Sequence, residues 1–334
     1  MLIAGTRCPC PRAYSTEVVI IRVRAKFMPT PAGLPPIFEN TPVDLVPSQQ
    51  IAAFPVNTFL ESIAIASDNT LFITNHFEGK VIRIGADKIP VIHVEVSGKA
   101  TGLAFTPDGN LLLTGWDEQG TSTIFKISPQ GVVDTLLSVP EAMFLNGLTH
   151  LTGDYYLIAD SYRGAIWELN ARQKTIRIWL EHPLLARTSP DQEFPAVNGL
   201  KRFDDVLYAS NTQKQHIVRI PIQANRQHGE PEIFVSQVNI DDFAFDRVGN
   251  LYGTTHIYNS VVKIAPDRKV SAIAQAEQGM TGSTALAFGR VEGDRTGIYV
   301  VTNGGMSLSL PTGIGPAQVV RLEVGIEGLP LISC

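Results

Sequence analysis

Six segments of the chain share one pattern of residues, and this internal repeat limits the fold more than any other feature of the sequence. Each segment is a short apolar run, a turn rich in Asp, Gly or Asn, and a second apolar run, which is the pattern of a β-hairpin. The segments are LESIAIASDNTLFITNH from Leu60, ATGLAFTPDGNLLLTGW from Ala100, LNGLTHLTGDYYLIADS from Leu145, VNGLKRFDDVLYASNT from Val197, IDDFAFDRVGNLYGTTH from Ile240 and STALAFGRVEGDRTGIYVVTN from Ser283.

A third apolar run follows every hairpin, and a fourth follows the first five. The third runs are KVIRI, TIFKI, AIWEL, HIVRI, VVKI and QVVRL. Equivalent positions of successive hairpins are 40, 45, 52, 43 and 43 residues apart, a period typical of four-stranded propeller blades. The sequence therefore predicts an all-β fold, a six-bladed β-propeller with four antiparallel strands per blade, over residues 45–334.

The sixth repeat lacks a fourth strand, so one end of the chain must complete the ring. Either PSQQIAAF, which begins at Pro47, or the C-terminal GLPLIS could supply this strand. The N-terminal segment is favoured because its distance from the first hairpin matches the other intervals between fourth and first strands. Residues 1–44 are Pro-rich and lack periodicity, which predicts a disordered tail.

The charge and the cysteines restrict the partners and the compartment. The formal net charge is -5, with no block of like charges, which argues against nucleic acid and against a basic membrane-binding surface. No apolar run is long enough to span a bilayer. The only cysteines, Cys8, Cys10 and Cys334, lie near the chain ends, and their odd number favours a reducing compartment such as the cytoplasm. We therefore expect a small-molecule substrate, no nucleic acid and no membrane.

One position of the repeat is polar in all six blades. It is the second residue of each hairpin: Glu61, Thr101, Asn146, Asn198, Asp241 and Thr284. Because the innermost strands of a propeller start on one face of the disc, these side chains should ring one mouth of the central channel. Two carboxylates and two amides suit a hard divalent cation, and Ca²⁺ in particular. The predicted ligands are Glu61, Asn146, Asn198 and Asp241, although in any one blade Asn-Gly or Asp-Asp could instead be ordinary turn residues.

The second strands end at the same mouth, and their last residues are candidates for a substrate pocket. His76 and His256 are candidate general bases, because imidazole exchanges protons near neutral pH. We expect the substrate to contact the following residues: Thr101, Trp116, Asp160, Asn211 and Asn303. The weaker candidates are His150, Tyr162 and Tyr258. The insertion EHPLLARTSPDQEFPA, residues 181–196, is a candidate lid or pocket wall.

The stretches NGLTHLTGDYYLIADSYRGAIWEL and FTPDGNLLLTG resemble the six-bladed propellers of the regucalcin and gluconolactonase group, the senescence-marker-protein family. Paraoxonase, diisopropyl fluorophosphatase and strictosidine synthase have related propellers. The resemblance covers roughly residues 45 to 325, and it implies a Ca²⁺ held by Glu61, Asn146, Asn198 and Asp241. The ligand order Glu, Asn, Asn, Asp is similar to that of paraoxonase and the fluorophosphatase. Gluconolactonases would be expected to carry Asp at position 198 and Asn at position 101, and this chain has Asn198 and Thr101.

The resemblance implies a calcium-dependent hydrolase of a lactone or ester, in which the cation polarises the scissile carbonyl and a base activates water. That base would be Asp241, His76 or His256. Two alternatives stay open because one fold hosts many functions. The first is a non-hydrolytic biosynthetic enzyme that condenses or cyclises its substrate, similar to strictosidine synthase or to the fungal propellers that resemble hetero-Diels–Alderases. The second is a metal-stabilised binding module without turnover.

Overall fold

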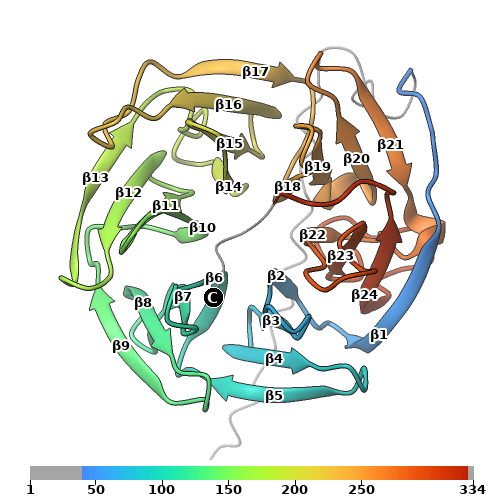
Figure 1. The fold of residues 1–334 in the computed structure, drawn as a ribbon, viewed down its shortest axis with the longest axis horizontal. Helices are drawn as coiled ribbons and strands as arrows, with labels where there is room; N and C mark the ends of the chain where they lie inside the picture. Colours follow the sequence, from blue (N-terminus) through green and yellow to red (C-terminus); the bar gives the residue numbers. More distant parts are fainter. Residues whose placement is uncertain (1–39, 330–334) are drawn as a thin grey trace, which may run out of the picture.

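Six four-stranded antiparallel sheets surround a central channel in the computed structural model of the chain, which describes residues 40–329 (Figure 1). The predicted six-bladed β-propeller is confirmed. The innermost strands are β2 (Leu60–Ile65), β6 (Lys99–Phe105), β10 (Leu145–Thr152), β14 (Val197–Phe203), β18 (Phe243–Phe245) and β22 (Ser283–Phe288). The second strands are β3 (Leu71–Asn75), β7 (Leu111–Trp116), β11 (Tyr155–Asp160), β15 (Val206–Asn211), β19 (Leu251–Thr254) and β23 (Gly297–Thr302).

The outer half of each blade follows the same chain order. The third strands are β4 (Lys80–Ile84), β8 (Ser122–Ile127), β12 (Ala165–Asn170), β16 (His216–Pro221), β20 (Val261–Ile264) and β24 (Pro316–Glu323). The outermost strands are β5 (Pro90–Glu95), β9 (Val133–Ser138), β13 (Thr175–Glu181), β17 (Glu232–Ser236), β21 (Val270–Ala274) and β1 (Ser48–Val56). Two short 3₁₀ helices, η1 (His256–Tyr258) and η2 (Ala276–Gln278), follow β19 and β21. No helix in residues 40–329 is long and apolar enough to cross a membrane.

The N-terminal segment closes the ring. Strand β1 pairs antiparallel with β24, so the sixth sheet has the order β1-β24-β23-β22, and the blue strand lies against the red blade in Figure 1. The expectation that the N-terminal segment supplies the missing strand is confirmed. This pairing stabilises the ring because it joins the two ends of the chain and leaves no blade incomplete.

The stretch before β1 also contacts the propeller. Val43 forms a parallel bridge with Ala272 of β21, and the Val46 amide donates to the Ile273 carbonyl at 2.9 Å. Residues 42–44, which fall within the predicted tail, therefore run along the edge of the fifth blade. The rest of the predicted tail, with Cys8 and Cys10, lies outside the described residues, as does Cys334.

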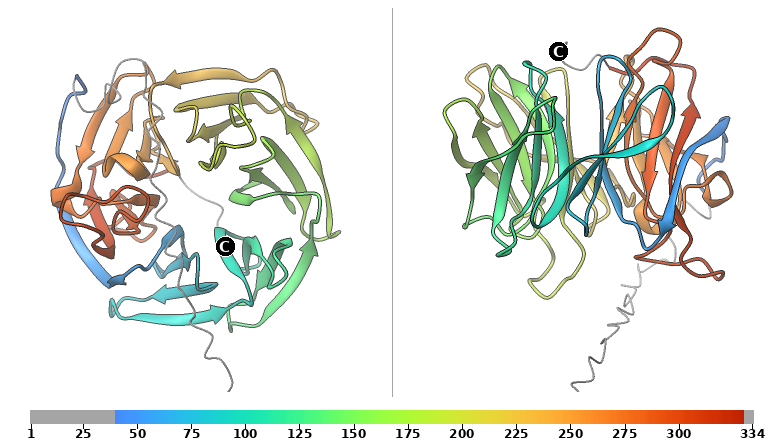
Figure 2. Two further views of the ribbon diagram at one scale, coloured as in Figure 1. Left: turned by 180° about the vertical axis from the view of Figure 1, so that it is seen from behind. Right: turned by 90° about the horizontal axis from the view of Figure 1, so that it is seen from below.

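The core consists of apolar layers between neighbouring blades rather than one central cluster. Ile73 of the first blade, for example, packs with Val301 and Val319 of the sixth, and Leu157 of the third packs with Leu207 of the fourth. Six such clusters separate the six pairs of blades. The side view in Figure 2 shows the blades standing around the axis with loops at both faces. Burial between blades leaves the inner strand edges free to line the channel.

Candidate functional site

Each inner strand has an irregularity at the predicted ring position. The pairing register shifts between Leu60 and Ile63, and equivalent shifts occur at the start of β6, β10, β14 and β22. In the fifth blade, regular pairing begins only at Phe243, after Asp241. A β-bulge changes the direction of the side chains that it contains. The same local break therefore recurs where the repeat carries Glu, Thr, Asn or Asp.

Glycine follows the ring residue in the second, third and fourth blades because the next inner strand passes very close. A Cβ atom at Gly102 would overlap the carbonyl oxygen of Asn146, and one at Gly147 would overlap that of Asn198. Only glycine allows this approach. Asn146 lies within β10 and Asn198 within β14, so neither Asn-Gly pair is a turn.

Hydroxyl groups of the second strands connect the ring positions of neighbouring blades. The Thr114 Oγ1 hydroxyl accepts from the Gly102 amide at 2.9 Å and donates to the Asn146 carbonyl at 2.8 Å. Ser210 Oγ joins the Gly199 amide to the Asp241 carbonyl in the same way, at 2.8 Å for both bonds. Equivalent hydroxyls belong to Thr74 and Thr254. These bonds fix the backbone of one ring residue against the next.

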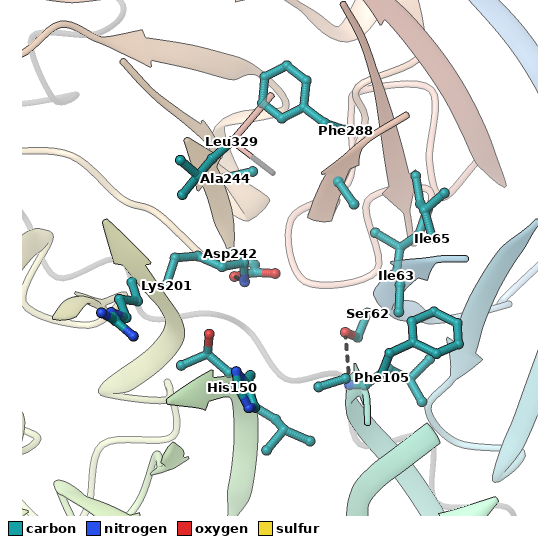
Figure 3. A pocket seen from close by; sticks show the side chains of 18 of the residues that line it. Ser62, Ile63, Ile65, Phe105, His150, Lys201, Asp242, Ala244, Phe288 and Leu329 are labelled. Atoms are coloured by element: carbon teal, nitrogen blue, oxygen red, sulfur yellow. Dashed lines mark hydrogen bonds and ion pairs between the residues drawn. The ribbon is translucent and has the colours of Figure 1, made fainter. Parts of the chain in front are cut away.

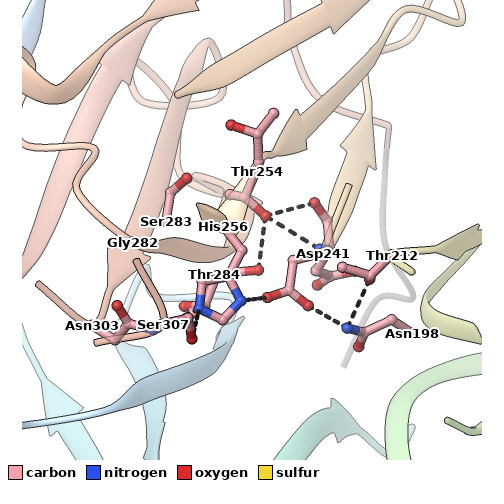
Figure 4. Close-up of polar contacts among 12 residues, drawn as sticks. Asn198, Thr212, Asp241, Thr254, His256, Gly282, Ser283, Thr284, Asn303 and Ser307 are labelled. Atoms are coloured by element: carbon pink, nitrogen blue, oxygen red, sulfur yellow. Dashed lines mark hydrogen bonds and ion pairs between the residues drawn. The ribbon is translucent and has the colours of Figure 1, made fainter. Parts of the chain in front are cut away.

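Asp241 is the centre of a buried polar cluster at the ring (Figure 4). Its Oδ2 atom lies 2.8 Å from His256 Nδ1, and its Oδ1 atom accepts from the Asn198 amide nitrogen. The side chains of His256 and Asp241 are only 13% and 5% exposed. Helix η1 begins at His256, two residues after the end of β19, and places the His256 imidazole against Asp241. Two of the three predicted bases are therefore in direct contact.

The other ring nitrogen of His256 has two partners from the last long loop. The Asn303 Nδ2 amide lies 2.8 Å from His256 Nε2, and Ser307 Oγ lies 3.0 Å from it. The Asn303 amide oxygen accepts from the backbone of Gly305 and Met306 at 2.9 and 3.1 Å. This fixes the amide nitrogen as the donor to His256. His256 is thus held as the neutral tautomer that donates from Nδ1 to Asp241.

Ser307 was missed by the sequence analysis. It lies beyond the end of β23, outside every repeat, so no repeat position indicated it.

The four predicted cation ligands occupy the same repeat position in the first, third, fourth and fifth blades. Burial, with the charges of Asp241 and Asp242, raises the pKa of Glu61 well above its ordinary value, and a bound cation would oppose this shift. The Asn146 amide nitrogen is buried and has no hydrogen-bond partner among residues 40–329, so a bound ligand could set the orientation of this amide. Two carboxylates and two amides fit a hard divalent cation. No group of three or more His, Cys, Asp or Glu side chains in residues 40–329 could hold a metal ion, so any ion here depends on the asparagines.

Aromatic rings form a continuous arc around the mouth. Phe59 lies 5.8 Å from His256 and 5.6 Å from His76, measured between ring centroids. His76 lies 5.9 Å from Trp116, and Phe144 lies 4.6 Å from Trp116 and 5.0 Å from Tyr162. The arc gives one side of the mouth an apolar wall that begins at His256. Phe59 and Phe144 had not been singled out, since both precede the inner strands rather than end the second strands.

His76 differs from His256 in its surroundings. Burial lowers the pKa of His76 to about 4, and its Nδ1 lies 2.8 Å from the Ala100 carbonyl. The ring is therefore neutral at pH 7 with Nδ1 as a donor. No carboxylate contacts it among the described residues, so His76 lacks the group that would stabilise a proton during catalysis.

Three predicted substrate contacts make extensive hydrogen bonds inside the protein. Asp160 accepts from the amides of Met143 and Phe144 and from the Trp167 indole, at 3.0, 2.9 and 3.2 Å. The Asn211 amide donates to the carbonyls of Leu184 and Ala186. The hydroxyl of Thr101 donates to the Leu145 carbonyl at 2.8 Å. These bonds position loops and neighbouring blades, and a role for these residues in substrate binding stays a prediction.

The weaker candidates lie in three different places. The Tyr162 hydroxyl donates to the Glu193 carbonyl at 3.1 Å, and the Arg187 guanidinium lies 4.5 Å from its ring centre. The insertion 181–196 thus contacts the aromatic arc. Tyr258 is at the end of η1, where its hydroxyl accepts from the Gln215 amide at 3.4 Å. His150 lines a cavity of about 380 Å³ on the turn side of the ring, away from the mouth.

Known structures share the fold at low sequence identity. No family model and no curated protein matches the chain. The calcium-binding protein regucalcin from Agrobacterium tumefaciens is 14% identical, with a TM-score of 0.69, over 87% of this chain and 98% of that one. A luciferin-regenerating enzyme is 14% identical, with a TM-score of 0.67, over 86% and 99%. A gluconolactonase from Xanthomonas campestris is 13% identical, with a TM-score of 0.63, over 84% and 89%. At these identities the likeness establishes the propeller fold alone.

Proposed function

We propose that the protein is a cation-assisted hydrolase of a small lactone or ester, with its active site at the mouth that Asp241 and His256 share. The observation that carries this proposal is the 2.8 Å contact between Asp241 Oδ2 and His256 Nδ1. A carboxylate that orients an imidazole and stabilises its protonated form is the arrangement by which hydrolases activate a nucleophile. The gluconolactonase name of one structural neighbour is consistent with this reaction type.

His256 Nε2 is the atom that would take up a proton. A water molecule that replaces the Asn303 amide at Nε2 transfers a proton to it as the water oxygen attacks the carbonyl carbon. The developing imidazolium is stabilised by Asp241, and the Ser307 hydroxyl oxygen can accept from the new Nε2–H. When the carbon–oxygen bond of the ester breaks, Nε2 returns the proton to the leaving oxygen. The products are a carboxylic acid and an alcohol, or one hydroxy acid from a lactone.

The ring residues would supply the electrostatic part of the reaction. A divalent cation held by Glu61, Asn146, Asn198 and Asp241 would act as a Lewis acid toward the carbonyl oxygen. Burial, with the charges of Asp241 and Asp242, raises the pKa of Glu61, and a positive charge bound beside Glu61 would stabilise its ionised form.

The aromatic arc favours a substrate with an apolar body. Trp116, Phe144 and Tyr162 form one wall of the mouth, and an apolar wall beside a polar centre is typical of small-molecule sites. The chain also has Asn198 and Thr101 where the resemblance to gluconolactonases leads one to expect Asp and Asn. Both features favour a lactone with an alkyl or aryl substituent over a sugar lactone.

The test is a panel of alkyl lactones and aryl esters, assayed with Ca²⁺ and after chelation. We expect turnover that requires Ca²⁺ and that falls by about 10²-fold or more in Asp241→Asn, since removing a group that orients the base costs at least this much. Asp134→Asn, on the exposed outer strand β9, is the matched control and should keep full activity. Cation-independent turnover, or equal activity in the two variants, would contradict the proposal.

The same arc supports one alternative, a non-hydrolytic site for an apolar ligand. If the panel binds without turnover while a polycyclic ligand quenches the Trp116 fluorescence, the protein is a cyclising enzyme or a binding module. The Asp241 and His256 pair distinguishes these two, because only an enzyme would lose product formation in His256→Gln while still binding the ligand.

A further inference from the structure

A second cavity lies at the turn-side end of the channel (Figure 3). Its volume is about 380 Å³, and it is lined by the later residues of all six inner strands and by some of their turns. None of the four predicted cation ligands lines it. We propose that this cavity is a separate binding site for a neutral aromatic ketone, a molecule with an apolar ring system and one carbonyl oxygen that accepts hydrogen bonds.

Most of the lining residues are apolar. Figure 3 shows Ile63, Ile65 and Phe105 on one side of the cavity, and Phe288 and Leu329 beside one another at the end of the apolar side. Phenylalanine rings pack well against the edge or face of an aromatic ligand. The volume lies within the roughly 300–1,000 Å³ range of small-molecule pockets, which are mainly apolar. The body of the ligand is therefore expected to be an apolar ring system.

The ammonium and the carboxylate that face the cavity neutralise each other. Lys201 Nζ lies 2.5 Å from Asp242 Oδ1, and the two side chains are 25% and 17% exposed. A ligand carboxylate at Lys201 would be repelled by Asp242, and a ligand ammonium at Asp242 would be repelled by Lys201. This pair therefore selects neither an anion nor a cation.

The two guanidinium groups of the lining have acceptors within the protein. Arg202 donates to the carbonyls of Leu151 and Asp204, at 2.8 and 2.6 Å, and to the Asp205 carboxylate at 3.1 Å. Arg290 donates to a backbone carbonyl of β2 at 3.3 Å. The other acidic residue of the lining, Asp204, lies at an exposed turn, where water solvates its carboxylate. The arginines are thus engaged before any ligand enters.

The imidazole in the lining is neutral as well. Burial lowers the pKa of His150, and its Nε2 atom lies 2.7 Å from the Gly153 carbonyl. A charged ligand would therefore leave water for a partly enclosed cavity whose charged groups are already paired or hydrogen-bonded, and this transfer is unfavourable. The cavity should select a neutral molecule.

Two hydroxyl groups of the lining remain available as donors. Ser62 Oγ accepts from the Leu103 amide at 3.3 Å, and within residues 40–329 the Ser62 hydroxyl hydrogen has no acceptor. The Thr149 hydroxyl makes no hydrogen bond to any residue of the same range. Either hydroxyl can donate to a carbonyl oxygen. A ketone fits better than an alcohol, because Asp242 and the Gly153 carbonyl already accept from the protein and leave little for a ligand donor.

The first test compares naphthalene ligands that differ in one substituent. The ligands are 2-acetylnaphthalene, 2-naphthoate and (naphthalen-2-yl)methylammonium, each titrated into the wild-type protein by calorimetry with chelator present. We expect 2-acetylnaphthalene to bind at least about tenfold more tightly than either charged ligand. Equal or tighter binding of a charged ligand would overturn the assignment to neutral molecules. Binding of none of the three would overturn the site itself.

The second test concerns the ketone oxygen. The double variant Ser62→Ala/Thr149→Val removes both hydroxyl donors, and 2-ethylnaphthalene has no oxygen to accept from them. We expect the double variant to bind 2-acetylnaphthalene about fivefold more weakly than the wild type, the effect of one lost hydrogen bond. Its affinity for 2-ethylnaphthalene should change by less than about twofold, since this ligand makes no such bond. An equal change for both ligands would overturn the assignment to a ketone.

The third test locates the ligand by its binding, independently of any turnover. Ala244→Phe places a ring in the cavity, and Ala86→Phe adds the same ring in an exposed turn. We expect Ala244→Phe to bind 2-acetylnaphthalene at least about tenfold more weakly, and Ala86→Phe to bind as the wild type does. Trp116→Ala, which alters the aromatic arc at the mouth, should also bind normally, whether or not the proposed hydrolysis is confirmed. Loss of binding in Trp116→Ala would place the ligand at the mouth and overturn the proposal.

A crystal structure with 2-acetyl-6-bromonaphthalene decides the matter if Ala244→Phe does not fold. The bromine should be found among Phe105, Phe288 and Leu329, with the carbonyl oxygen at Ser62 or Thr149. Bromine density beside Trp116 would contradict the assignment.

Discussion

Asp241 and Asp242 are consecutive carboxylates that serve opposite ends of one channel. Asp241 contacts a neutral imidazole and an amide at the mouth, whereas Asp242 contacts an ammonium in the cavity on the turn side. The two side chains therefore point in different directions from neighbouring backbone positions. Two consecutive residues at the start of one inner strand can thus lie in different electrostatic environments. At the mouth the negative charge stays available to a proton or a cation, and in the cavity it is neutralised by Lys201.

The largest expected effect concerns the mouth. His256→Gln removes the proton acceptor and should lower kcat/KM for the best ester substrate by about 10²- to 10⁴-fold. Ser307→Ala removes only a hydroxyl at 3.0 Å from Nε2, so it should change the rate by less than about tenfold if water is the nucleophile. Steady-state kinetics of both variants test this. An equal loss in Ser307→Ala would assign the attack to the serine hydroxyl and replace the water mechanism.

A second prediction uses the pH dependence of His76. Its pKa is lowered to about 4 by burial, so between pH 6.5 and 4 the unfolded chain binds a proton that the folded protein does not. The free energy of unfolding must therefore fall as pH falls through this window, by about 3 kcal/mol for this residue, at 1.36 kcal/mol for each unit of pKa. Denaturant unfolding at pH 7 and pH 4.5 measures it. Other buried histidines also lower the free energy of unfolding at acid pH, so both measurements are repeated on His76→Gln. Between pH 7 and pH 4.5 this variant should lose less free energy of unfolding than the wild type does.

The ion pair of the turn-side cavity should contribute less to stability. Lys201→Met leaves Asp242 without its cationic partner, and we expect a loss of about 2 kcal/mol in the free energy of unfolding, less than for a fully buried pair because both side chains are partly exposed. Lys126→Met removes a comparable but exposed pair with Asp108, at 3.5 Å, and should cost less than about 0.5 kcal/mol. Equal losses in the two variants would show that partial burial in the cavity does not strengthen the Lys201–Asp242 ion pair.

The smallest expected effect is a gain in stability. Glu61→Gln removes a carboxylate whose ionised form is disfavoured by burial and by the charges of Asp241 and Asp242, so the metal-free variant should be more stable than the wild type by about 1 kcal/mol. Ca²⁺ should raise the Tm of the wild type and leave that of the variant unchanged. Glu118→Gln, at an exposed turn, is the control. A metal-free variant less stable than the wild type would mean that Glu61 makes a structural contact instead.

The sequence predicted the blades well because each blade is a local unit. Hairpins between consecutive strands need only short-range turns and alternating apolar residues, and these recur from Leu60 to Ser283. The ring position was also visible, since Glu61, Asn146, Asn198 and Asp241 occupy one place in the repeat. Ser307 and Phe59 lie outside the aligned segments, so nothing in the repeat indicated them.

The amino-acid sequence by itself determined the number of blades, the strand order and the polar position at the start of each inner strand, because these depend on neighbouring residues and on a repeated pattern. Only the tertiary structure decided that His256 meets Asp241, that Ser307 reaches the same imidazole, and that Lys201 pairs with Asp242 in a cavity on the other side of the ring. These contacts join different blades and loops, and their distances follow from closing the ring and from the bulges at its inner edge.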